Sequence, residues 1–205
     1  VTSPYITGGP TSDPAPSLYT HGSVTYPTTD EELYSVTVNG SSTPSTWSGT
    51  NGCTTAAPGT GSVLGSYSNF TTLGPLTTVN AGSAYSFTVV ENECDGATYF
   101  SNGIGVWVDW NRDGDFLDAG EQLYTEASTA TSPRTVTQSF TVPSGASAGW
   151  TRMRFIVGEG YSGTGLIPTL SPGYGEIEDW MINVQNLSPV NPSYTYTWNP
   201  GSLSG

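Results

Sequence analysis

Residues 106–116 read VWVDWNRDGDF, and this stretch decides the fold. Its first half is an apolar run typical of a β-strand. Its second half places side-chain oxygens at alternate positions, Asp109, Asn111 and Asp113, and Gly114 follows. A calcium loop begins in this way, with oxygen ligands at positions 1, 3 and 5 and a glycine at position 6. Because the loop follows a strand and not a helix, the stretch predicts a calcium-stabilised β-domain.

The match to a helical calcium loop is partial after Gly114. Position 12, which carries a bidentate glutamate in such loops, is Gly120 here. An alternative interpretation is a polar turn in which Asp and Asn side chains bond their own backbone. The crowding of acidic groups beside the single Arg112 favours a cation, and an irregular all-oxygen cage suits Ca²⁺ better than Mg²⁺. The expected ligands are Asp109, Asn111, Asp113, Asp115 (through its carbonyl) and, to close the shell, Asp118 or Glu121.

The composition excludes several classes of partner. The chain has 205 residues, of which 10% are charged, and its net charge is −13. It has no lysine, and its four strongly basic residues are arginines. Nucleic acid is therefore excluded, because phosphate binding needs basic patches. No apolar run reaches membrane-spanning length, so we expect no membrane insertion. The low charge and the many Ser, Thr and Gly residues are typical of a secreted or cell-surface β-protein.

Short stretches of alternating apolar and polar residues predict an all-β protein. They occupy residues 34–38, 85–89, 104–108, 136–142, 153–157 and 180–184. We expect an antiparallel β-sandwich, jelly-roll-like or Ig-like, with long Gly/Ser/Thr loops at 42–62 and 158–173. The predicted organisation is an extended lead-in at 1–22, the sandwich at 23–185, and a linker with the start of a following β-module at 186–205.

Two cysteines, Cys53 and Cys94, lie in turn-like sequence settings. In an exported protein they would form a disulfide, and closing a loop of about 40 residues would contribute roughly 4 kcal/mol. The alternative is a pair of independent free thiols.

Several motifs occur in the order found in the bacterial GEVED domain, which this chain resembles over roughly residues 24–185. They are 106–116, Ala119-Gly-Glu121, Phe140-Thr-Val-Pro143, Gly149-Trp-Thr-Arg-Met-Arg154 and Gly175-Glu-Ile-Glu-Asp-Trp180. The resemblance implies a β-rich accessory module, without assigned catalytic activity, in large secreted or surface proteins of Bacteroidota-like bacteria. Neighbouring peptidase, adhesin or Ig-like modules are the partners it implies.

A catalytic role is disfavoured by the residues themselves. His21 is the single histidine and lies in the lead-in, so a histidine-based triad lacks its base. Glu176 and Glu178, with Asp109 or Asp179, could act as a glycosidase pair. We favour a structural role instead. Glu176 and Glu178 share the parity of Trp180 and should face inward, where the preferred partners are Arg152 and Arg154 on another strand and the alternative is the calcium at the Asp109 loop. Asp179 faces the other way, where it caps a turn or completes a metal shell.

Aromatic residues near loops offer a further possibility. Trp47, Tyr67, Tyr161 and Tyr174 could stack on sugar rings, or they could simply anchor loops. We therefore predict a non-enzymatic, calcium-stabilised β-sandwich module of a secreted or cell-surface multidomain protein, adhesin-like or filament-like. The alternative is a carbohydrate-binding accessory module of a secreted hydrolase. The expected partners are neighbouring domains and a surface glycan or protein.

Overall fold

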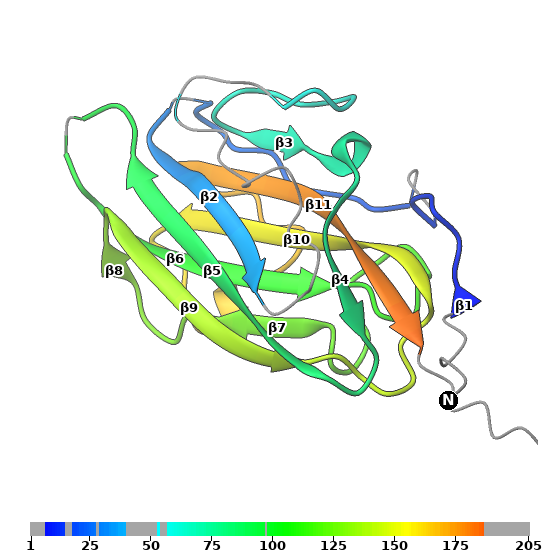
Figure 1. Cartoon of the computed structure of the whole chain (residues 1–205). Coiled ribbons are helices and arrows are strands. Elements are labelled where there is room, and N and C mark those ends of the chain that lie inside the picture. The colour runs from blue at the N-terminus through cyan, green and yellow to red at the C-terminus, as the bar shows by residue number, and fades with distance from the viewer. Residues whose placement is uncertain are drawn as a thin grey trace, which may run out of the picture.

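The computed structural model describes residues 7–14, 18–27, 29–39, 53, 57–96 and 98–186, which form two facing β-sheets (Figure 1). The larger sheet has the strand order β1-β11-β10-β6-β7, with β3 and β4 also paired to β11 and β8 to β6. Its strands are β1 (Thr7–Gly8), β3 (Tyr67–Asn69), β4 (Pro75–Asn80), β6 (Ser101–Val108), β7 (Gln122–Thr125), β8 (Ala130–Thr131), β10 (Gly149–Glu159) and β11 (Gly175–Asn186). The smaller sheet is β2 (Glu31–Asn39), β5 (Ala84–Glu93) and β9 (Arg134–Thr141). Two short 3₁₀ turns, Thr71–Leu73 and Gly163–Gly165, lie in the connections.

The predicted β-sandwich is confirmed, and its core follows the alternation of the strands. Phe87 in β5, Val106 in β6, Phe155 in β10 and Trp180 in β11 all point between the two sheets and are buried. Most strand pairs are antiparallel, as expected. The short strands β3 and β4 differ, because each runs parallel to β11.

The larger sheet is buried on its outer face as well. A second apolar cluster forms there, away from the inter-sheet core. Its members are Tyr19, Tyr67, Trp107, Phe116, Ile156, Leu166, Leu170 and Ile177. The residues that cover this face come from the lead-in and from the predicted long loop after β10, which supplies Leu166 and Leu170. Strands β10 and β11 are consequently almost continuously buried, like the strands of a doubly covered sheet.

The described part of the lead-in lies along this outer face. Strand β1 pairs with the end of β11, and the Pro10 carbonyl accepts the Trp150 N–H at 2.8 Å. His21, expected in a solvated loop, stacks on Tyr67 with ring centroids 3.6 Å apart. Trp47 and residues 187–205 lie outside the described residues. Within the described residues, no helix is long and apolar enough to cross a membrane.

Candidate metal site

The loop after β6 is built around the buried carboxylate of Asp109. Its Oδ1 accepts the Arg112 N–H, and its Oδ2 accepts the Gly114 N–H at 3.0 Å. The Tyr19 hydroxyl from the lead-in donates to Oδ2 at 2.5 Å. Gly114 has a φ of +103°, which explains the glycine at this position. Asp109 therefore organises the turn, as in the alternative interpretation of the motif, and both of its oxygens already accept hydrogen bonds.

Glu121 clamps the other side of the loop. This residue is 1% exposed, and its carboxylate accepts the Trp110 N–H at 2.8 Å and the Asp118 N–H at 3.1 Å. Burial raises its pKa to about 7. The Trp110 indole donates to the Gly120 carbonyl at 3.1 Å. Two buried carboxylates, Asp109 and Glu121, thus hold the backbone of the loop in place.

The exposed carboxylates of the loop converge. Asp113, Asp115 and Asp118 each place one carboxylate oxygen so that all three oxygens lie within 4.8 Å of one another. The Asn111 amide reaches the same group, donating to Asp113 at 2.9 Å and to Asp118 at 2.6 Å. Such a set of hard, negatively charged oxygens fits a calcium ion, which accepts irregular oxygen cages. Of the six expected ligands, the structure brings together Asp113, Asp115 and Asp118, with Asp115 contributing its carboxylate where its carbonyl was expected. Asn111 faces them with its amide NH₂, because its side-chain oxygen accepts the Asp113 N–H. Asp109 and Glu121 act as backbone clamps.

A second polar network lies on the outer face of the larger sheet, centred on the fully buried Asp179. Arg154 binds Asp179 with two N–H groups, Nε to Oδ1 and Nη2 to Oδ2, both at 2.7 Å. Arg152 Nη1 and the Tyr67 hydroxyl donate to the same Oδ2 at 2.9 and 2.8 Å. Arg152 also pairs with Asp13 of the lead-in. Burial by itself would raise the pKa of Asp179, but Arg154 and Arg152 outweigh it and hold the pKa below its ordinary value.

The predicted ladder between these arginines and Glu176 and Glu178 is wrong. In the antiparallel register Arg154 lies opposite Asp179, whereas Glu178 lies opposite the core residue Phe155. Arginines and glutamates therefore project from opposite faces of the sheet. Both glutamates are buried between the sheets, as their parity with Trp180 predicts.

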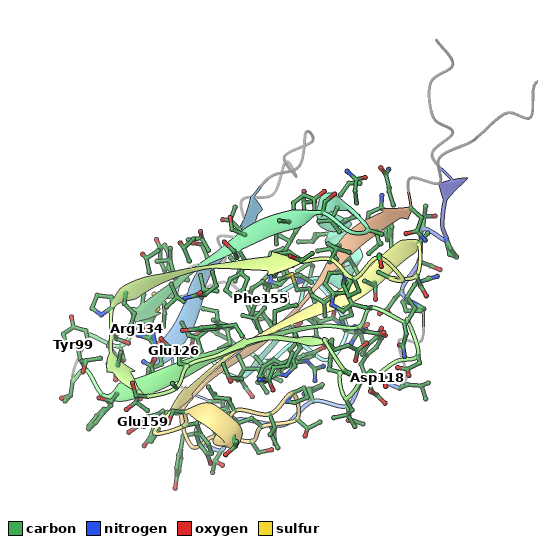
Figure 2. All side chains as sticks on the ribbon, turned by 90° about the horizontal axis from the view of Figure 1, so that it is seen from below. Tyr99, Asp118, Glu126, Arg134, Phe155 and Glu159 are labelled. Carbon is green, nitrogen blue, oxygen red and sulfur yellow. A yellow bond between two sulfur atoms is a disulfide. The ribbon has the colours of Figure 1, made fainter. Side chains whose placement is uncertain are left out.

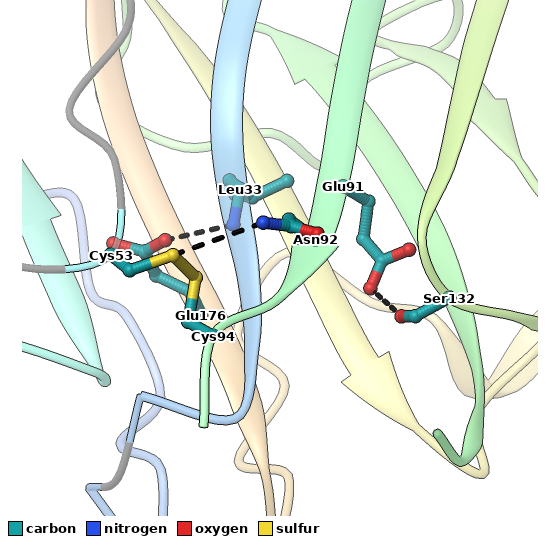
Figure 3. The surroundings of a disulfide bond; sticks show 7 residues. All are labelled: Leu33, Cys53, Glu91, Asn92, Cys94, Ser132 and Glu176. Carbon is teal, nitrogen blue, oxygen red and sulfur yellow. Dashed lines mark hydrogen bonds between the residues drawn. A yellow bond between two sulfur atoms is a disulfide. The ribbon is translucent and has the colours of Figure 1, made fainter. Parts of the chain in front are cut away.

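Glu176 ties three strands together on the inner side. Its carboxylate accepts the Leu33 N–H of β2 at 3.0 Å (Figure 3). It also accepts the Ser68 hydroxyl of β3 at 2.6 Å. Glu178 accepts the Trp180 indole N–H at 2.8 Å. Burial raises the pKa of Glu176 and, together with the nearby Glu176 carboxylate, raises that of Glu32 to about 11. Glu32 therefore carries a proton at neutral pH. The glycosidase interpretation is wrong for these residues, because no substrate can reach carboxylates that are at most 1% exposed.

The disulfide prediction for the two cysteines is confirmed. Cys53 and Cys94 form the predicted disulfide, with Cα atoms 5.3 Å apart (Figure 3).

Tyr67 is buried beneath His21 and cannot offer a free face to a sugar. Tyr174 stacks on Tyr26 with centroids 5.0 Å apart, and Tyr161 packs against the second apolar cluster. These three residues anchor loops, and they do not form a common stacking surface.

Sequence reasoning missed a second group of converging carboxylates, at Asp30, Glu93 and Asp95. The signal was present as acidic residues at alternate positions, Glu91, Glu93 and Asp95, at the end of a strand. We interpreted that segment as a turn, and only the pairing of β2 with β5 brings Asp30 to it.

The two-sheet architecture with an acidic loop at its edge defines a β-sandwich module. Residues 103–183 match the model of the GEVED domain family, as the resemblance implied. No curated protein sequence matches the chain.

Two solved structures are similar only at a low level. One is the CARDB domain of a Pyrococcus furiosus protein in complex with di-metal ions, with a TM-score of 0.34, 11% identity, and coverage of 82% of this chain and 93% of that one. The other is the PKD domain of an M14-like peptidase from a Thermoplasmatales archaeon, with a TM-score of 0.30, 16% identity, and coverage of 54% and 86%. Neither likeness carries an argument about the site.

Proposed function

We propose that this chain is a non-enzymatic, calcium-binding β-sandwich module of a secreted or cell-surface multidomain protein, adhesin-like or filament-like. The observation that supports it best is the convergence of the Asp113, Asp115 and Asp118 carboxylates in a loop that is already held in shape. Preorganised oxygens need little rearrangement to accept an ion. The GEVED match supports the modular, accessory role.

Calcium in this loop would act on stability. The three carboxylates repel one another, and a divalent ion would convert that repulsion into a cross-link within the β6–β7 connection. Extracellular calcium modules bind with dissociation constants of roughly 0.1–1 mM, so 1 mM calcium would stabilise the fold by about 0.4–1.4 kcal/mol.

Placement outside the cytosol is supported by the disulfide. Structural disulfides persist in oxidising compartments and are rare in the cytosol. Cys53 and Cys94 are paired, and no cysteine of the chain is free. The scarcity of charged side chains is in keeping with the same setting.

Terbium luminescence tests the loop site, because terbium replaces calcium and Trp110 lies within the loop to sensitise it. We expect terbium emission that calcium displaces, and an increase of a few degrees in melting temperature at millimolar calcium. The double variant Asp113→Asn/Asp118→Asn should lose the Trp110-sensitised emission and the part of the melting-temperature increase that comes from this loop. Glu159→Gln, which removes an acidic charge at the opposite end of the sandwich (Figure 2), is the matched control for the emission, because only the loop holds Trp110. If the double variant keeps the emission and the calcium response of the wild type, the loop is not the binding site.

A further inference from the structure

Asp30, Glu93 and Asp95 form a second acidic group at the end of the sandwich where β2 begins and β5 ends, and the Asp113 loop follows β6 at the other end (Figure 1). One carboxylate oxygen from each lies within 4.8 Å of the others. Asp30 immediately precedes β2 and Glu93 ends β5. The Cys94 N–H donates to the Asp30 carbonyl at 2.9 Å, and Cys94 is joined to Cys53. The backbone that carries the group is therefore fixed by a hydrogen bond and a disulfide.

Two buried carboxylates at this end of the sandwich, Glu93 of the group and the neighbouring Glu31, have no hydrogen-bond donor among the described residues. Glu31 is 0% and Glu93 is 6% exposed, yet none of their four carboxylate oxygens accepts a hydrogen bond within the described residues. Glu31 lies directly opposite Glu93 in the β2–β5 register, so both side chains project from the same face. The neighbouring Asp30 carboxyl also brings no positive charge to Glu93. Burial is expensive for a carboxylate without such partners.

The electrostatic environment makes these charges more unfavourable still. Burial, followed by the charge of Asp30, raises the pKa of Glu31 to about 8. Burial and the Asp30 carboxyl raise that of Glu93 to about 9. Both shifts reflect the lack of a positive charge beside the group.

All four arginines lie in the described part of the chain, and none of them is free to supply that charge. The chain has no lysine, and each arginine is engaged elsewhere. Arg112 donates to the carbonyls of Trp150 and Ala148, Arg134 pairs with Glu126, and Arg152 and Arg154 share Asp179. Neutralisation must therefore come from protons or from a cation that the solution provides.

We propose that Asp30, Glu93 and Asp95 bind a second divalent cation of the calcium type, with Glu31 as an additional carboxylate facing the ion. The donor set is entirely oxygen, which favours calcium over softer transition metals. Asp95 is exposed and gives the ion a route from solvent. The site is separate from the loop site of the proposed function and does not depend on it.

Isothermal titration of the full chain with calcium tests the proposal through the number of ions bound. We expect two ions for the wild type and one for Asp30→Asn/Glu93→Gln. The matched control is Asp113→Asn/Asp118→Asn, which should also bind one, and the four-fold variant should bind none. Near-UV circular dichroism checks that each variant is folded. Asp95→Asn, at an exposed position, provides a milder change that should weaken the second site at least about tenfold.

The outcomes separate the two sites. If Asp30→Asn/Glu93→Gln and Asp95→Asn both bind calcium as the wild type does, the second site does not exist and protons neutralise the group. The conclusion is the same if the wild type binds one ion and the Asp113→Asn/Asp118→Asn variant binds none. If the wild type binds one ion and the Asp30→Asn/Glu93→Gln variant binds none, the second site is supported and the proposed loop site is overturned.

Discussion

Among single residues, Asp179 illustrates how one buried carboxylate can organise a sheet face. It binds Arg152, Arg154 and the Tyr67 hydroxyl, and all four side chains are buried. Each guanidinium also rests on an aromatic ring, Arg152 over Tyr19 at 4.0 Å and Arg154 over Phe116 at 4.9 Å. Buried guanidinium groups need such partners because water cannot solvate them.

Asp179→Asn should lower the free energy of unfolding by about 3–5 kcal/mol at pH 7, because two buried positive charges lose their carboxylate. The pKa of Asp179 is lowered by folding, so its contribution is complete above the unfolded pKa of about 3.9 and declines as the pH falls toward the folded value. The difference between variant and wild type should therefore shrink below about pH 4. Urea unfolding at pH 7 and at pH 3 measures both effects.

Asp13→Asn is the control for this prediction, because Asp13 contacts Arg152 from a partly exposed position. We expect a smaller loss, of about 1 kcal/mol, because Arg152 keeps Asp179 as a partner when Asp13 is changed. An equal loss for Asp13 and Asp179, or a loss for Asp179→Asn that does not vary with pH, would contradict the role assigned to Asp179.

At the scale of elements, the entry into β11 depends on a close approach of two strands. Gly175 has a φ of +127°, and a Cβ at this position would lie 2.2 Å from the Val157 carbonyl oxygen of β10. Strand β11 carries Glu176, Glu178 and Asp179 directly after this glycine. The close approach of Gly175 to β10 therefore fixes where the residues of both polar networks lie. The close contact with β10 thus explains why the first residue of the family motif is a glycine.

Gly175→Ala should destabilise the protein by at least about 2 kcal/mol, because the backbone conformation is strained for alanine and the Val157 carbonyl must move. Gly173→Ala is a close control: its Cβ would meet nothing within 4 Å, and its φ is not positive. We expect stability there to stay unchanged or rise by up to about 1 kcal/mol. Chemical denaturation compares the two, and similar midpoints would refute the steric argument.

At the scale of the whole molecule, the lead-in completes the fold. Tyr19 joins the second apolar cluster, Asp13 pairs with Arg152, and the Thr20 carbonyl accepts an Arg154 N–H at 2.7 Å. Without these residues the outer face of β10 and β11 would expose apolar side chains, and Arg152 and Arg154 would each lose one of their partners. The lead-in is thus a third layer over that face.

Deletion of residues 1–22 should lower the free energy of unfolding by about 5 kcal/mol or more, through the lost burial of Tyr19 and the lost partners of two arginines. Deletion of residues 1–6 leaves every described contact in place and serves as control. Thermal unfolding of the two truncated proteins distinguishes them. If the protein that lacks residues 1–22 has the same melting temperature as the wild type, the lead-in does not stabilise the sheet.

Local sequence determined a large part of this protein. Period-two alternation in β5, β6 and β10 was enough to predict a β-sandwich and its inner core, because each strand has one face toward the other sheet. The order of short motifs predicted the match of residues 103–183 to the GEVED domain family. The spacing of Asp109, Asn111, Asp113 and Gly114 predicted the acidic loop, since neighbouring residues of a tight turn cannot lie far apart.

Only the tertiary structure decided which charges meet. The register of β10 against β11 places Arg154 opposite Asp179 and sends Glu176 and Glu178 to the other face, and a shift by one residue would reverse this. Parity along one strand does not reveal its alignment with the next, so the sequence could not choose between these partners. The same holds for Asp30 and Glu93, more than sixty residues apart in the chain, which only the pairing of β2 with β5 brings together.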